Sequence, residues 1–274
     1  MTSRLVRRAG APSLEVISAE PEGKPEGPTL LLLHGAFAGA WMWREIFMPY
    51  WAKRSRRSVA ISLRGHGGSA GRRGLSTTTL SDYLDDVREI IAECATPPVV
   101  IGHSLGGFLA QMLVGREQMR GLVLLASLPP DGMMFVGPQL ALSDPVFWLK
   151  VAVSSVVNNR HLIQAAEYRE LFSEHLSPEE VDRYSSMMTP EAPRALAETH
   201  LPHAIVPAVS FGIPTLVIGG GIDRLVWQAS TLRTALFHGG EHRIAEGLGH
   251  FLMLDHGAER VAHGVLDWLD RNGI

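Results

Sequence analysis

The stretch IGHSLGG, residues 101–107, lies between the apolar runs PPVV (97–100) and FLAQMLV (108–114). A serine adds nothing to a core, and glycines cost conformational entropy on folding. Residues 102–106 fit the pattern G-x-S-x-G, which is typical of a sharp turn from a buried strand into a helix. Such a turn lifts the Ser104 hydroxyl clear of a sheet, and the amino end of the following helix favours developing negative charge there. The stretch therefore predicts an exposed nucleophile.

Apolar runs without alternation recur along the chain and indicate its fold class. Strands that are buried on both faces of a parallel sheet have this pattern. The runs are residues 30–33, 58–63, 98–101, 121–126 and 214–218. Helical periodicity falls between them, over residues 79–93, where Thr79 and Asp82 form a predicted capping box, and over residues 257–273. The alternation predicts an α/β sheet with helices on both faces.

Two weaker patterns extend the predicted sheet. SLEVISAE, residues 13–20, is expected to be an edge strand, and HRIA, residues 242–245, a short strand before the last helix. The basic stretches RLVRR (4–8) and KRSRR (53–57) are interpreted as solvated faces.

The rhythm of strand and helix breaks over residues 131–207, where consecutive helices are expected with no strand between them. Three of these helices have a predicted cap followed by proline. The pairs are Asp144-Pro145, Ser177-Pro178 and Thr189-Pro190. No long linker flanks the segment. We therefore expect a core domain of residues 1–130 and 208–274, with a helical cap of residues 131–207 inserted into it.

Composition excludes several classes of protein. The 274 residues are 46% hydrophobic and 19% charged, which is typical of one large globular unit, and a net charge of −3 offers no broad basic field for nucleic acid. The single cysteine, Cys94, allows no intrachain disulfide, and the apolar runs are too short to span a membrane. We expect a cytoplasmic protein, and the sequence leaves open whether it forms a homodimer. His200 and His203 flank Pro202 with no clear third ligand, so no metal site is expected.

A serine nucleophile needs a base, and the base needs a carboxylate to orient it. His250, in a glycine-flanked loop before the last helix, is the best of twelve histidines for the base. Asp223 follows a buried strand, and Asp131 is its rival after another. The chain order Ser104, Asp223, His250 favours Asp223.

An acyl-transfer site also needs two N–H donors for the oxyanion. Leu105, directly after the nucleophile, is expected to supply one. The second is expected from HGAFAGAW, residues 34–41, with Ala36 preferred and Phe37 as the alternative. His34 is expected to brace this loop.

With these pieces the chain resembles the α/β-hydrolase superfamily, in its serine-nucleophile, esterase- and lipase-like branch. The matching pieces are HGAFAGAW, LRGHGGS, GHSLGG, GGGIDRLV and GLGHFLMLD, in the superfamily's order. The resemblance implies a mostly parallel eight-stranded sheet, a cap inserted after the sixth strand, and a catalytic triad at Ser104, Asp223 and His250. One departure is Ser62, at a position where the superfamily often has aspartate. Arg64 and His66 of this motif are interpreted as loop bracing.

The resemblance implies cleavage of a small-molecule carboxylic ester without a cofactor. Hydroxynitrile lyases of the superfamily resemble these esterases but use a cap lysine and an oxyanion-loop threonine; here the cap holds only Lys150 and the loop reads Ala36-Phe37. Carbon–carbon bond hydrolases often have tryptophan where Phe251 stands, and they remain an alternative. A non-catalytic ligand-binding member of the fold is a second alternative.

Apolar residues of the cap are expected to line an adaptable pocket. They are Met133, Met134, Phe135, Phe147, Trp148, Met187 and Met188. The residues predicted to contact substrate are Phe37, His103, Phe135, Trp148 and Phe251.

Overall fold

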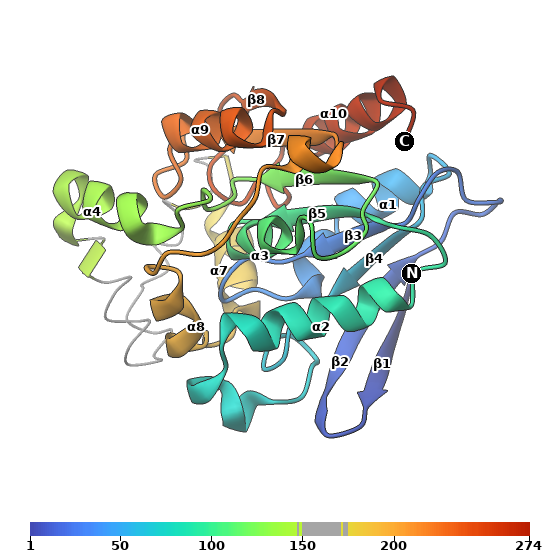
Figure 1. Ribbon diagram of the computed structural model, residues 1–274, viewed down its shortest axis with the longest axis horizontal. Helices are drawn as coiled ribbons and strands as arrows, with labels where there is room; N and C mark the ends of the chain where they lie inside the picture. The colour runs from blue at the N-terminus through green and yellow to red at the C-terminus, as the bar shows by residue number, and fades with distance from the viewer. Residues whose placement is uncertain (147, 150–170, 172–174) are drawn as a thin grey trace.

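The computed structural model describes residues 1–146, 148–149, 171 and 175–274 (Figure 1). Phe147 and Lys150 lie outside the described residues. Within this part of the chain, the strands form a single eight-stranded sheet in the order β1-β2-β4-β3-β5-β6-β7-β8. The strands are β1 (Thr2–Arg8), β2 (Ala11–Ala19), β3 (Leu30–Leu33), β4 (Ser58–Ile61), β5 (Val99–His103), β6 (Gly121–Leu125), β7 (Thr215–Gly220) and β8 (Glu241–Ala245). The six strands from β4 to β8 in this order pair in parallel with their neighbours. Strand β2 pairs antiparallel with both β1 and β4. The predicted mostly parallel α/β fold is confirmed.

Strand β3 shows why the central runs are apolar throughout. Leu30 and Leu32 point into one core layer and Leu31 and Leu33 into the other, and all four are fully buried. The helices α1 (Phe47–Ala52) and α10 (Ala258–Arg271) pack on the first layer. The second layer lies under α2 (Leu80–Ala92), α3 (Leu105–Leu113) and α9 (Gln228–His238). Both faces of the sheet are therefore covered by helices.

Helix α2 begins where its sequence predicts. The Thr79 hydroxyl accepts a hydrogen bond from the Asp82 N–H, and the Asp82 carboxylate accepts one from the Thr79 N–H. This reciprocal pair satisfies two backbone donors that the first helical turn leaves without partners. The predicted capping box is confirmed.

The edge of the sheet differs from the prediction. Residues 13–19 of the expected strand fall in β2, which lies inside the sheet, and the basic stretch 4–8 belongs to β1 at the edge. On β1 only Val6 is buried, so this strand has no apolar pattern for the sequence to reveal. It is held by backbone pairing with β2 and by ion pairs of Arg4 with Glu93 and of Arg8 with Asp86.

Between β6 and β7 the described residues contain helices and no strand. They include the α-helices α4 (Met133–Ser143), α7 (Pro178–Met187) and α8 (Pro193–Glu198) and the short 3-10 helix Ala208–Phe211. The predicted cap at Ser177 is confirmed as a capping box with Glu180. The predicted helix start at Thr189-Pro190 is wrong, because α8 begins at Pro193. The division into core and cap stays a prediction.

The extended backbone before α8 has a physical cause. The Thr189 N–H donates to the Phe37 carbonyl oxygen at 2.8 Å, and the buried side chain of Glu191 binds the core. These tertiary contacts override the local preference of Thr-Pro for starting a helix.

No helix among the described residues is long and apolar enough to cross a membrane.

Candidate active site

Ser104 lies on the turn between β5 and α3 in a conformation that residues with side chains rarely adopt, with φ 51° and ψ −116°. The flanking glycines make the turn possible. A Cβ on Gly102 would lie 2.4 Å from the Gly106 carbonyl oxygen, and one on Gly106 would lie 2.4 Å from the Leu33 carbonyl oxygen. The predicted strand–turn–helix geometry is present. Within the described residues, the Ser104 hydroxyl makes no hydrogen bond, and Ser104 borders a cavity.

His250 and Asp223 form a buried pair. The distance from His250 Nδ1 to Asp223 Oδ2 is 2.8 Å. The other oxygen, Oδ1, accepts hydrogen bonds from the N–H groups of Leu225 (2.8 Å) and Val226 (3.0 Å), which fix the carboxylate. A proton on Nδ1 satisfies this contact and leaves Nε2 as an acceptor. The pair has the geometry of a base with its orienting acid.

Parallel pairing explains why these three residues lie at the same edge of the sheet. Ser104, Asp223 and His250 follow β5, β7 and β8, whose carboxyl ends lie at one edge of the sheet. The rival acid, Asp131, instead pairs with Arg233 at 3.0 Å on the surface, and its burial raises its pKa. The structure therefore places Asp223, not Asp131, beside His250.

His103 and Phe251 pack against His250, and neither belongs to the cavity lining that the described residues form. His103 Nε2 is 3.0 Å from the His250 carbonyl oxygen, and the two rings are 4.7 Å apart between centroids. The Phe251 ring contacts both histidines, at 5.3 and 5.6 Å. Burial lowers the pKa of His103 well below its ordinary value, so this ring stays neutral. Both rings pack against His250, and their expected contact with substrate stays a prediction.

A cavity of about 320 Å³ opens beside Ser104. Most of its lining is apolar, with Ser104 and His200 as the polar side chains. The lining residues are Ala36, Phe37, Ser104, Leu105, Leu128, Met133, Leu140, Trp148, Pro193, Leu196, Ala197, His200 and Leu225. Phe37 and Trp148 were predicted to contact substrate, and both belong to this lining. Phe135 does not; it is 58% exposed, beneath the Arg233 guanidinium.

Several lining residues were missed because nothing in their local sequence distinguishes them. Leu196, Ala197 and His200 reach the cavity from α8 and the residues just after it.

Among the described residues, no group of three His, Cys, Asp or Glu side chains could hold a metal. His203 instead binds the Glu198 carbonyl oxygen through Nε2 at 2.7 Å.

The loop after β3 contains both candidates for the second backbone N–H donor, and the candidate for the first donor is Leu105. The Phe37 N–H is occupied, because it donates to Glu191 Oε2 at 3.1 Å. In the part of the chain that the structure describes, the N–H groups of Ala36 and Leu105 have no acceptor, and both residues border the cavity. Between the two loop candidates, the geometry therefore favours Ala36 over Phe37 as a donor to a bound oxygen.

His34 braces this loop, as expected. Its Nδ1–H donates to the Gly35 carbonyl oxygen at 2.7 Å, and its Nε2 accepts from the Leu63 N–H at 3.0 Å. Burial and the neighbouring His66 lower the pKa of His34 to about 3. A neutral His34 therefore ties the loop after β3 to the loop after β4.

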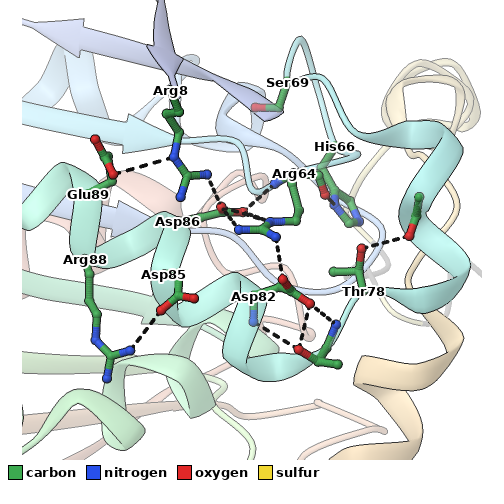
Figure 2. A network of polar contacts seen from close by, with 12 residues as sticks. Arg8, Arg64, His66, Ser69, Thr78, Asp82, Asp85, Asp86, Arg88 and Glu89 are labelled. Carbon is green, nitrogen blue, oxygen red and sulfur yellow. Dashed lines mark hydrogen bonds and ion pairs between the residues drawn. The ribbon is translucent and has the colours of Figure 1, made fainter. Parts of the chain in front are cut away.

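The loop after β4 is held in turn by a buried ionic network. Figure 2 shows Arg64 and Arg8 both reaching the Asp86 carboxylate on α2, while Asp82 binds Arg64 from the same helix. Beside this network, the Ser62 hydroxyl donates to Glu15 Oε2 at 2.7 Å and accepts from the Ala40 N–H at 2.9 Å. Glu15 thus places a carboxylate beside Ser62, the position where relatives often have aspartate. The interpretation of this motif as loop bracing agrees with these contacts.

A sharp strand-to-helix turn at Ser104, a buried His–Asp pair and an apolar cavity, on a mostly parallel sheet with helices on both faces, are the features of an α/β hydrolase fold. The sequence pattern of the alpha/beta hydrolase family matches residues 30–263. The chain belongs to this family.

Individual proteins resemble this chain either over a short stretch or at low sequence identity. Protein phosphatase methylesterase 1 of Bos taurus is 39% identical over 88 residues, which are 31% of this chain and 23% of that protein. The chain therefore matches about a quarter of the length of this relative. An esterase from Exiguobacterium antarcticum has a similar fold, with a TM-score of 0.77, 13% identity, and coverage of 98% of this chain and 100% of that one. A thermophilic esterase from Thermogutta terrifontis aligns with a TM-score of 0.70, 20% identity and 99% coverage of both chains.

Proposed function

We propose that the protein is a serine hydrolase that cleaves carboxylic esters through an acyl-enzyme. The observation that carries this proposal is the buried His250–Asp223 pair, at 2.8 Å, on the sheet edge where Ser104 borders the cavity. The names of the methylesterase and esterase relatives support the same class of reaction.

Each residue has a defined role in this reaction. His250 Nε2 removes the Ser104 hydroxyl proton as Oγ attacks the ester carbonyl carbon. Asp223 stabilises the imidazolium that results. The N–H groups of Ala36 and Leu105 donate to the oxyanion. His250 then protonates the departing alcohol, and with its help a water molecule hydrolyses the acyl-enzyme and restores the Ser104 hydroxyl.

The cavity indicates the class of acyl group. Its lining in the described residues includes no Lys, Arg, Asp or Glu. A charged group would lose its hydration there without gaining a partner, whereas an apolar chain gains by leaving water. Burial lowers the pKa of His200, which favours a neutral ring. We therefore propose an uncharged, apolar acyl group as the part of the substrate that enters this cavity.

Initial rates on p-nitrophenyl esters from acetate to decanoate test the proposal, with wild type and Ser104→Ala side by side. Loss of a triad nucleophile is expected to lower kcat on the order of 10⁴-fold or more. A fluorophosphonate probe should label wild type and not Ser104→Ala. A folded wild-type protein that hydrolyses none of these esters and takes no label would contradict the proposal.

A further inference from the structure

Glu191 is a buried carboxylate outside the proposed triad, on the segment between α7 and α8. Its side chain is 1% exposed, and both of its oxygens are engaged. Oε1 accepts hydrogen bonds from the Tyr83 hydroxyl at 2.5 Å and from the Ala192 N–H at 2.7 Å. Oε2 accepts one from the Phe37 N–H at 3.1 Å and lies 3.1 Å from His66 Nε2. One carboxylate therefore joins the loop after β3, the loop after β4 and helix α2.

His66 carries the positive charge that balances Glu191. Its Nδ1–H donates to the Arg64 carbonyl oxygen at 3.1 Å, while Nε2 faces the carboxylate. An oxygen faces each ring nitrogen, an arrangement that favours the doubly protonated, charged form of the ring. Burial alone would lower the pKa of His66, but the Glu191 carboxylate raises it above its ordinary value. The fully buried pair is thus an ion pair, while the adjacent His34 ring is neutral.

The Phe37 backbone is held from both sides by residues 189–191. Its N–H donates to Glu191, and its carbonyl oxygen accepts from the Thr189 N–H at 2.8 Å. Phe37 has a φ of 64°, a left-handed conformation that costs energy for a residue with a side chain. Such strain persists only where the surroundings hold it. Because Ala36 directly precedes Phe37, the direction of the Ala36 N–H depends on this clamp.

We propose that Glu191 is a positioning residue for the oxyanion hole: by holding Phe37, it aims the Ala36 N–H at the substrate oxygen beside Ser104. The proposal rests on the proposed ester hydrolysis and adds one residue to it. In this arrangement, the positive charge of His66 balances the negative charge of Glu191. A carboxylate this close to the oxyanion loop would repel developing negative charge if no cation balanced it.

The variant Glu191→Gln tests the clamp, because an amide keeps the size of the side chain but loses its charge and one of its two acceptor oxygens. On p-nitrophenyl butyrate we expect kcat to fall about 10²-fold with KM within about 3-fold, since a displacement of about 1 Å at a catalytic group has this effect. Glu198→Gln is the matched control. Glu198 also joins this segment to the core, through the Leu80 N–H at 2.9 Å, but it does not contact the oxyanion loop. This control is expected to keep wild-type kcat.

Inhibition by phenylboronic acid provides a readout that a loss of stability alone would not change. Boron forms a tetrahedral adduct with a nucleophilic serine, and one of its oxygens occupies the oxyanion hole. The inhibition constant should rise by the same factor as kcat/KM falls. If Glu191→Gln does not fold, Glu191→Asp takes its place, because it keeps the charge and shortens the reach; we expect about a 10-fold loss in kcat.

Three results would overturn the proposal: an unchanged kcat in the Glu191 variant, a change confined to KM, or an equal loss in Glu198→Gln. Failure of the proposed function looks different, because wild type would then neither hydrolyse esters nor react with fluorophosphonate. In that case both proposals fall together. If wild type is active, the Glu191 variants test the positioning role independently of the proposed function.

Discussion

Gly106 lies so close to the Leu33 carbonyl oxygen that a Cβ on it would come within 2.4 Å of that atom. The contact joins the first turn of α3 to the end of β3, and backbone on both sides leaves little room to adjust. The fixed position of Ser104 thus depends on the absence of a single methyl group two residues away.

Gly106→Ala is expected to lower the free energy of unfolding by about 3 kcal/mol, because overpacking against backbone costs this much. Gly23→Ala should change it by less than about 0.5 kcal/mol, since a Cβ there meets nothing within 4 Å. Urea unfolding followed by circular dichroism measures both. Equal stability of the two variants would show that the backbone at the turn adjusts more easily than its geometry indicates.

Asp223→Asn should lower kcat on the order of 10⁴-fold while leaving KM nearly unchanged, because the amide favours the wrong tautomer of His250. Asp131→Asn is the control, and its kcat should stay within a few-fold of wild type, since Asp131 pairs with Arg233 on the surface. Initial rates of both variants on p-nitrophenyl butyrate measure these changes in kcat. A large loss in Asp131→Asn with an active Asp223→Asn would reverse the assignment of the acid.

Removal of Asp86 should be far more damaging than removal of its neighbour Asp85. Asp86→Ala leaves the Arg8 and Arg64 guanidiniums without their shared buried partner (Figure 2) and is expected to cost about 3–5 kcal/mol of stability. Asp85→Ala breaks only a surface pair with Arg88, worth about 0.5 kcal/mol. Chemical denaturation of both variants makes the comparison, and a cost below 1 kcal/mol for Asp86→Ala would contradict it.

The His66–Glu191 pair should stabilise the fold most strongly between about pH 4.5 and 6.5. Burial opposes the charge of Glu191, but His66 and the hydrogen-bond donors lower the pKa of Glu191 from 4.5 to about 2. That part of the stability is complete above pH 4.5 and is lost as the pH falls toward 2. The raised pKa of His66 contributes stability that is complete below 6.5 and is lost as the pH rises through the folded value.

His66→Gln should therefore cost about 3 kcal/mol near pH 5.5 and clearly less at pH 9. The urea midpoints of wild type and variant at the two pH values give the difference. His256→Gln is the control, because its contact with Glu180 is exposed, and its effect should stay below about 0.5 kcal/mol. A cost of His66→Gln that does not change with pH would show that its charge contributes nothing.

Filling the cavity should shorten the preferred acyl chain. Leu196 lines the cavity, so Leu196→Trp is expected to move the optimum of the p-nitrophenyl ester series to a shorter chain and to lower kcat/KM for decanoate at least 10-fold. Leu201→Trp, at an exposed position outside the lining, should keep the wild-type profile. Identical profiles for both variants would place the acyl group elsewhere.

The central strands could be predicted from sequence because burial on both faces leaves a continuous apolar run, as in Leu30–Leu33. The edge strand β1 could not, because one buried residue, Val6, carries no pattern. The triad candidates were visible because each follows a strand in a recognisable loop. Their catalytic role stays a prediction until Ser104→Ala is measured.

The rest depends on tertiary contacts that local sequence does not encode. Phe135 and Trp148 are similar aromatic candidates in sequence, yet only Trp148 borders the cavity. Glu191 stands between two prolines in TPEAP, and nothing in that stretch distinguishes a buried clamp from a surface loop. Its partners, Tyr83 and Phe37, are more than 100 residues away in the chain.

The contacts of residues 189–199 also set a rule for recombining this protein with its relatives. Thr189 and Glu191 hold the loop after β3, Glu198 holds the start of α2, and the Thr199 carbonyl oxygen accepts from the Met133 N–H at 2.9 Å. A chimaera that exchanges residues 131–207 as one block would exchange these fastenings as well. A crossover placed before Thr189 would keep the host's own contacts of Thr189, Glu191 and Glu198, and only the contact between Met133 and Thr199 would span the junction.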